Sequence, residues 1–262
     1  MPNALDKIIA AKHEYLEKAK VDAPESSLRE QVTEAPPVRD FLAALSGAPP
    51  IRLIAEVKKS SPSRGAIRPN CDPASIARIY QWHGAACVSV LTDGPYFQGS
   101  LDDLRQVRAA VQLPVLRKDF VIDPYQVLEA RQAGADAVLL IADCLEGGQL
   151  ADLYAAVHEL GMTPLVELHD PDQLDRVLEL GAKLIGVNNR DLHTLEVDLN
   201  HSLRMRHIIP ADRIMVGESG IRNRQDVERL ETSGVQAMLV GGTLMARRDI
   251  GNAVDGLLGK TS

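Results

Sequence analysis

The sequence predicts an α/β protein in which eight parallel strands, each followed by a helix, close into a (β/α)8 barrel of the TIM type. From Ile51 onward, short apolar runs alternate strictly with amphipathic stretches, which implies a parallel sheet. The 262 residues match a single-domain barrel, which needs roughly 250. An open doubly wound sheet is the alternative. It usually has fewer strands and would carry a G-x-G-x-x-G motif after its first strand, which this sequence lacks.

The elements follow from apolar periodicity and from helix start and stop signals. The expected strands are residues 51–57, 86–91, 114–118, 136–141, 163–167, 184–188, 213–217 and 236–240. The expected helices are residues 74–83, 101–111, 124–133, 148–160, 171–180, 203–208, 225–233 and 250–258. Asp72 and Asp123, each followed by proline, predict N-caps. Glycines stand where helices should stop, at Gly84, Gly134, Gly161, Gly181 and Gly234.

Residues 1–48 differ from the rest of the chain. Leu5, Ile8 and Leu16 repeat at helical spacing, and prolines at 24, 36–37 and 49–50 punctuate the segment. The segment is too short to hold a core of its own. We therefore expect residues 1–48 to form a helical extension packed on the barrel, and residues 49–262 to form the barrel as the single catalytic domain.

Composition excludes several classes of function. The net charge of -7 and the 3% aromatic content argue against a nucleic-acid partner. The start of the chain has no long apolar stretch, and no run is long enough to span a membrane, so a cytoplasmic protein is expected. The three cysteines are widely spaced, which predicts free thiols in a reducing compartment. No histidine spacing supports a metal site, and no Gly-x-Ser-x-Gly elbow indicates a serine hydrolase.

Polar groups follow the expected strands at their carboxyl ends. Glu56 and Lys58 are two residues apart and therefore point to the same side of the first strand. Alone they could mark a site rim or an edge strand that ends in solvated charges. The pattern recurs at the ends of later strands, with Lys118, Glu167, Asn188, Arg190 and Glu218. Because these ends meet at one mouth of a barrel, the recurrence favours a site.

The charges at the mouth allow two interpretations. Lys58 and Lys118 could crowd each other, which would lower the pKa of each and suit a lysine acid. They could also be ion-paired, with Glu56 and Glu218 as partners, and both interpretations can hold together. Glu167 is expected opposite the lysines across the barrel, and a structural salt bridge is favoured for Arg190.

The loops after the seventh and eighth strands contain small residues, Ser219-Gly220 and Gly241-Gly242. Glycine lets backbone N–H groups approach an anion closely, so the two loops predict a phosphate site. The alternative is that these glycines only turn tight corners.

Several stretches together resemble successive motifs of the indole-3-glycerol phosphate synthase family, in the family's order and over nearly the whole chain. They are Ile54-Ala55-Glu56-Val57-Lys58-Lys59-Ser60-Ser61-Pro62-Ser63, Tyr96-Phe97-Gln98-Gly99-Ser100, Leu116-Arg117-Lys118-Asp119-Phe120, Leu165-Val166-Glu167, Gly186-Val187-Asn188-Asn189-Arg190-Asp191-Leu192 and Gly217-Glu218-Ser219-Gly220-Ile221.

The resemblance implies a cofactor-free and metal-free (β/α)8 lyase. Such an enzyme closes the indole ring of 1-(2-carboxyphenylamino)-1-deoxyribulose 5-phosphate and releases carbon dioxide and water, in tryptophan biosynthesis. The implied partner is therefore a phosphorylated small molecule, with no nucleic acid or membrane involved. A monomer or weak homo-oligomer is expected.

The resemblance also implies residue roles. Lys118 would be the general acid at the substrate carbonyl, and Glu167 an acid/base group in the dehydration. Lys58 would contact the substrate carboxylate or phosphate, with a possible part in proton transfer. The remaining implied site residues are Glu56, Asn188 and Glu218, which orient these groups and stabilise the cationic intermediate; Ser61 and Arg190, which match site positions; Phe97 and Phe120, which pack the anthranilate ring; and Ser219, Gly220, Gly241 and Gly242, which surround the phosphate.

Two departures from the family pattern bear on the site. Gly242 stands where members often carry serine, which would remove a side-chain bond to phosphate. Asp93-Gly94-Pro95 precedes Tyr96 where a more charged loop is common.

Two other functions are weighed. A phosphoribosylanthranilate isomerase barrel would need a Cys/Asp acid–base pair, and no cysteine here ends a strand beside such an aspartate. A non-catalytic phosphate-binding or scaffold barrel is disfavoured because Lys118 and Glu167 are both present.

Overall fold

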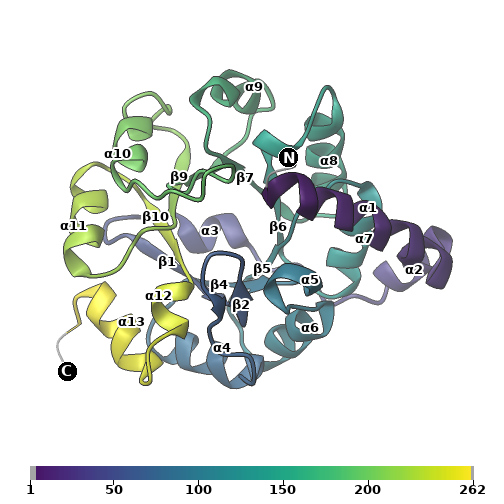
Figure 1. Cartoon of the computed structure of the whole chain (residues 1–262), viewed down its shortest axis with the longest axis horizontal. Helices are drawn as coiled ribbons and strands as arrows, with labels where there is room; N and C mark the ends of the chain where they lie inside the picture. The colour runs from purple at the N-terminus through teal and green to yellow at the C-terminus, as the bar shows by residue number, and fades with distance from the viewer. Residues whose placement is uncertain (1–3, 261–262) are drawn as a thin grey trace.

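The computed structural model describes residues 4–260, in which eight parallel strands form a closed barrel (Figure 1). The first strand pairs with both the last strand and β4, which closes the ring. The predicted (β/α)8 fold is therefore confirmed. The strands are β1 (Arg52–Val57), β4 (Cys87–Leu91), β5 (Val115–Lys118), β6 (Ala137–Ile141), β7 (Thr163–Leu168), β8 (Leu184–Asn188), β9 (Ile214–Glu218) and β10 (Ala237–Val240).

Helices surround the barrel and begin and end close to the predicted positions. The ring consists of α4 (Pro73–Trp82), α6 (Leu101–Ala110), α7 (Pro124–Gln132), α8 (Gln149–Glu159), α9 (Leu174–Glu179), α10 (Asn200–Arg206), α11 (Arg224–Thr232) and α13 (Ile250–Leu258). Asp72 and Asp123 accept hydrogen bonds from the first-turn N–H groups of α4 and α7, as expected of N-caps. The predicted glycine stops all have positive φ, between 74° and 90°.

Several short elements were not predicted, because they are too short to show a periodicity. They are the hairpin strands β2 (Ser60–Ser61) and β3 (Gly65–Ala66), the helices α5 (Gly94–Phe97) and α12 (Gly242–Met245), and the 3-10 turns η1 (Ala142–Cys144) and η2 (Pro171–Gln173). Two predicted helix starts were also wrong. α10 begins at Asn200 rather than residue 203, and the helix expected from residue 171 begins as η2 before α9.

The barrel interior explains why the polar strand ends face the mouth. Ile54, Leu116, Leu165 and Val216 belong to one buried cluster inside the ring of strands. The residues two positions further along these strands are Glu56, Lys118, Glu167 and Glu218. Because side chains alternate along a strand, these polar groups continue the interior face and point into the mouth.

The N-terminal extension forms α1 (Ala4–Asp22), α2 (Glu25–Val32) and α3 (Phe41–Leu45). Phe41 and Leu45 are fully buried within the interior cluster of the barrel. The backbone N–H of Arg39, just before α3, donates to Asp136 at the start of β6 (2.7 Å). α3 therefore covers the end of the barrel opposite the mouth.

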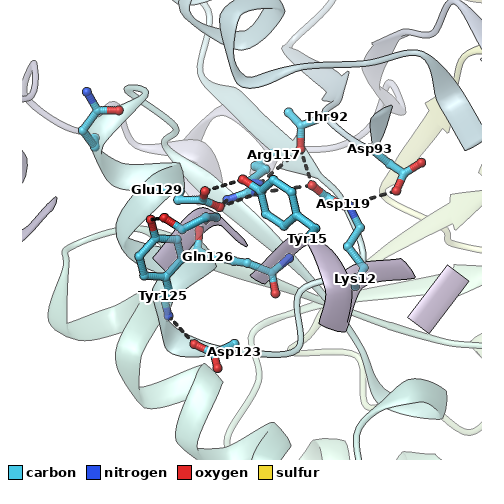
Figure 2. Close-up of polar contacts among 12 residues, drawn as sticks. Lys12, Tyr15, Thr92, Asp93, Arg117, Asp119, Asp123, Tyr125, Gln126 and Glu129 are labelled. Atoms are coloured by element: carbon cyan, nitrogen blue, oxygen red, sulfur yellow. Dashed lines mark hydrogen bonds and ion pairs between the residues drawn. The ribbon is translucent and has the colours of Figure 1, made fainter. Parts of the chain in front are cut away.

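α1 is held against the barrel by a buried polar network (Figure 2). Lys12, which is 5% exposed, lies between Asp93 (2.9 Å) and Asp119 (2.7 Å). Asp119 also pairs with the buried Arg117 (3.1 Å). Burial raises the pKa of Asp119, but the nearby Arg117 and Lys12 outweigh it and hold that pKa below its usual value. The network joins the extension to the residue that follows Lys118.

We expect Lys12→Met to lower the free energy of unfolding by about 3–5 kcal/mol, because it removes one partner of a buried ion pair and leaves Asp93 without its cation. Urea unfolding would measure the change. Lys20→Met is the matched control, since it breaks an ion pair from the same helix to Asp123 whose partners are 44% and 28% exposed. It should cost no more than about 1 kcal/mol. Equal effects of the two substitutions would contradict a buried anchor at Lys12.

Candidate active site

The mouth of the barrel holds a compact group of charged and amide side chains, here called the mouth cluster. Its members are Glu56, Lys58, Lys118, Glu167, Asn188 and Glu218, and they come from the carboxyl ends of β1, β5, β7, β8 and β9 or the residue just after. All of them line one cavity. The structure thus brings together in space the residues that the sequence placed at separate strand ends.

Lys118 is the centre of the mouth cluster. Its Nζ lies 2.8 Å from Oε2 of Glu167 and 3.6 Å from Oε2 of Glu218. The second oxygen of Glu167 accepts a hydrogen bond from Nδ2 of Asn188 (2.9 Å). The expectation that Glu167 lies opposite the lysines was therefore wrong for Lys118. The barrel is narrow enough at its mouth for side chains from β5 and β7 to meet.

The electrostatics of Lys118 also differ from the crowded-cation interpretation. Burial by itself lowers the pKa of Lys118, but the carboxyl groups of Glu167, Glu218 and Glu56 raise it more, so that pKa lies above its usual value. The neighbouring carboxyl groups thus favour the ammonium form of Lys118. The expected ion pairs of Lys58 with Glu56 and of Lys118 with Glu218 are confirmed, and Glu167 is a closer partner of Lys118 that was not expected.

The two glutamates beside Lys118 have pKa shifts in opposite directions. Burial and the negative charge of Glu167 raise the pKa of Glu218 well above its usual value. Burial acts in the same direction on Glu167, but contact with the Lys118 ammonium lowers the pKa of that carboxyl below its usual value. Neighbouring carboxyl groups with opposed pKa shifts are typical of acid–base sites. The opposed shifts favour the ionised form of Glu167 and the protonated form of Glu218.

Lys58 and Glu56 form a second pair, with Nζ 2.5 Å from Oε1 of Glu56. The Glu56 carboxyl lies so close to the β10 loop that a Cβ on Gly241 would come 2.1 Å from Oε1. A Cβ on Gly186 would similarly come 2.4 Å from Oε1 of Glu218. These two positions need glycine because the buried carboxyl groups occupy the space that any side chain would fill.

One wall of the cavity is apolar. The rings of Phe97 and Phe120 lie 6.3 Å apart between centroids, tilted by 37°. Leu5 and Ile8 of α1 also line the cavity, so the extension forms part of the site. Sequence analysis identified Leu5 and Ile8 as apolar residues at helical spacing but missed their place in the site. Periodicity identifies the apolar face of a helix, yet it does not identify what that face covers.

The small-residue loops also line the cavity. Ser219 and Gly220 have φ of 65° and 78°, and Gly241 and Gly242 lead into α12. Ser61 and Arg190 line the same cavity. The guanidinium of Arg190 donates to the carbonyl of Leu195 (2.8 Å), and no carboxylate of residues 4–260 forms an ion pair with it. The expected structural salt bridge of Arg190 was therefore wrong within this range.

Sequence analysis also missed Arg64, which lines the cavity from the turn between β2 and β3. Its position directly after the Ser61-Pro62-Ser63 motif was the available signal. The sequence position alone did not show that Arg64 reaches the cavity. Only the structure places this turn beside the loop after β10.

Sequence comparison gives one consistent result. The family model described as Indole-3-glycerol phosphate synthase matches residues 5–257. The chain belongs to the indole-3-glycerol phosphate synthase family. This family consists of carboxy-lyases of tryptophan biosynthesis, so the resemblance stated from the motifs is confirmed.

Individual relatives cover nearly the full length. The indole-3-glycerol phosphate synthase of Rhodopirellula baltica is 50% identical over 254 residues, covering 97% of this chain and 98% of its own. The one of Leptothrix cholodnii is 50% identical over 260 residues, covering 98% and 99%.

Solved structures support the fold alone. The 3-hexulose-6-phosphate synthase of Salmonella typhimurium superposes with a TM-score of 0.65 at 13% identity, covering 80% of this chain and 97% of its own. The thiamine phosphate pyrophosphorylase of Pyrococcus furiosus gives a TM-score of 0.60 at 14% identity, covering 79% and 93%.

No helix within residues 4–260 is long and apolar enough to cross a membrane. Over the same range, no group of three or more His, Cys, Asp or Glu side chains is placed to hold a metal ion. Cys71, Cys87 and Cys144 are all free thiols.

Proposed function

We propose that the mouth cluster closes the indole ring of 1-(2-carboxyphenylamino)-1-deoxyribulose 5-phosphate, with loss of carbon dioxide and water. The single observation that carries this proposal is the Lys118 ammonium, buried between two glutamates and next to an apolar wall. This arrangement presents a proton donor at the place where an aromatic ring and a ketone would meet.

Ring closure needs a proton at the ketone oxygen while the ring carbon that bears the carboxylate attacks the ketone carbon. Lys118 supplies this proton. Phe97 and Phe120 hold the anthranilate ring against the apolar wall, and Lys58 and Ser61 bind its carboxylate. The bond between the ring carbon and the carboxylate then breaks, and the carboxylate leaves Lys58 and Ser61 as carbon dioxide. The electron pair of the broken bond stays in the ring and restores its aromaticity.

Dehydration follows, and Glu167 is the acid/base group for it. Asn188 holds one oxygen of Glu167, so the carboxyl keeps a fixed direction while the other oxygen exchanges a proton. Because Lys118 and Glu167 are in contact, a proton accepted by one can be passed to the other without a large movement. Glu56 and Glu218 orient the two lysines and stabilise the cationic intermediate.

The substrate phosphate is bound at the loops after β9 and β10 by Ser219, Gly220, Gly241 and Gly242, with Arg190 nearby. Positive φ at Ser219 and Gly220 turns the backbone so that its N–H groups can face an anion. Inorganic phosphate is therefore expected to compete with the substrate.

Gly220→Val should weaken both phosphate inhibition and substrate binding, because a Cβ at Gly220 would come 2.8 Å from the Val197 side chain and strain a backbone with φ of 78°. The inhibition constant of inorganic phosphate measures the effect. Gly234→Val is the matched control, since its φ is 83° but nothing lies within 4 Å of the added Cβ. It carries similar backbone strain far from the cavity and should leave phosphate inhibition unchanged. Equal inhibition constants in wild type and Gly220→Val would exclude this cradle.

Incubation of the protein with the ribulose phosphate substrate, followed by indole fluorescence, tests the proposed reaction directly. Indole-3-glycerol phosphate should accumulate. If no product formed, the scaffold interpretation would be favoured. If phosphoribosylanthranilate were converted instead, the isomerase interpretation would be favoured.

A cytoplasmic location and a monomeric or weakly associated state remain predictions. Size-exclusion chromatography with light scattering would test the oligomeric state.

A further inference from the structure

Arg64 is an arginine of the cavity that the proposed reaction does not yet use. It lies on the turn of the β2–β3 hairpin, in the loop after β1, and its side chain is exposed. The guanidinium reaches the loop after β10, where Nη1 donates to the carbonyl of Gly242 (3.2 Å). Two loops that are far apart in sequence are thus joined at the phosphate end of the cavity.

This contact depends on the absence of a side chain at position 242. A Cβ added to Gly242 would come 3.2 Å from Nη1 of Arg64, closer than a normal van der Waals contact. The guanidinium therefore fills the space that a side chain at 242 would use. Gly242 itself offers no hydroxyl to an anion, so a donor at this place has to come from elsewhere.

The charges around Arg64 are unbalanced. No carboxylate of the described residues forms an ion pair with Arg64 or with Arg190. The two guanidinium groups are near enough to affect each other. Burial and, after it, the positive charge of Arg64 lower the pKa of Arg190. Two unpaired cations at one end of a cavity repel each other, and an anion bound between them would relieve this repulsion.

We propose that Arg64 is a binding residue for the substrate phosphate, with its guanidinium in the space that a side chain at position 242 would otherwise fill. When phosphate enters, the guanidinium leaves the Gly242 carbonyl and donates to the phosphate oxygens. Its planar N–H groups suit two parallel hydrogen bonds to a phosphate, which a lysine cannot form. This inference rests on the proposed phosphate cradle of the loops after β9 and β10.

Arg64→Gln should raise the inhibition constant of inorganic phosphate and the KM of the substrate by about 10-fold or more, since it removes a charge-assisted hydrogen bond. The rise in KM should exceed any fall in kcat, because the bond exists in both the ground state and the transition state. Arg64→Lys should recover only part of the loss. Arg222→Gln is the control for long-range charge, since it removes an exposed arginine two residues after Gly220 that does not line the cavity.

A double-mutant cycle of Arg64→Gln with Gly242→Ser tests whether the Arg64 guanidinium and a side chain at position 242 use the same space. In the wild-type background the serine crowds Arg64 and should not improve phosphate binding. In the Arg64→Gln background the new hydroxyl has free space and should recover part of the lost affinity, so the two effects should not add.

Equal inhibition constants for Arg64→Gln and Arg222→Gln, or strictly additive effects in the cycle, would overturn the role of Arg64. Gly220→Val separates this failure from failure of the cradle. If Gly220→Val weakens phosphate binding while Arg64→Gln does not, only the inference about Arg64 is wrong. If neither changes it, the phosphate cradle itself is misplaced. Equal melting temperatures of the variants would show that the differences in inhibition constant come from binding and not from loss of folded protein.

Discussion

Lys118→Met is expected to lower turnover by about 10²–10⁴-fold, the usual loss when a general acid is removed. Methionine has a similar length but no proton to give. Because Lys118 acts on the ketone oxygen only as the ring closes, the affinity for the substrate should change by a modest factor. The KM and kcat of the purified variant, followed by indole fluorescence, give both numbers.

The buried carboxyl groups around Lys118 make a control necessary. Removal of the ammonium leaves Glu167 with Asn188 and Glu218 as its remaining partners, and the pKa of Glu167 should rise as a result. Lys59→Met is a matched substitution one residue after Lys58. It breaks a partly buried ion pair with Asp103 (2.7 Å) that does not line the cavity. If Lys59→Met and Lys118→Met lost turnover equally, or if Lys118→Met kept near wild-type turnover, Lys118 would not be the acid.

Glu167→Gln is expected to block a later step than Lys118→Met. Glutamine preserves the volume and much of the hydrogen bonding to Asn188, but it cannot exchange a proton. If Glu167 serves dehydration, the first turnover should release carbon dioxide while the indole product appears late. Lys118→Met should release little carbon dioxide and leave the substrate bound and unchanged. Rapid quenching of a single turnover, with the two products measured separately, distinguishes these patterns.

The contact between Glu167 and Lys118 refines this expectation. The Glu167 carboxylate helps to keep Lys118 protonated, so its loss should also slow ring closure to some extent. The decisive quantity is therefore the interval between carbon dioxide and the indole product. Glu218→Gln is the control, since Glu218 has a raised pKa and is proposed to orient its neighbours and stabilise the cationic intermediate, not to exchange a proton in dehydration. It should delay both products together. An equal delay of both products in Glu167→Gln would place that residue in ring closure or binding.

The sequence by itself determined the local structure and the composition of the site. Alternating side chains along each strand are a property of the backbone, so Leu116 inside the barrel already directs Lys118 to the mouth. The caps at Asp72 and Asp123 and the glycine stops are equally local. Order along the chain and motif resemblance were sufficient to name the candidate site residues, since each motif carries its residues in a contiguous stretch.

Only the tertiary structure decided which of these residues touch. The distance between the ends of β5 and β7 depends on how all eight strands close, and it places Lys118 beside Glu167 rather than across from it. The raised pKa of Glu218 depends on burial and on the charge of Glu167 from another strand. The contacts of Lys12 with Asp93 and of Arg64 with Gly242 join segments far apart in sequence. Such contacts depend on the packing of the whole barrel, for which no local pattern of residues contains a signal.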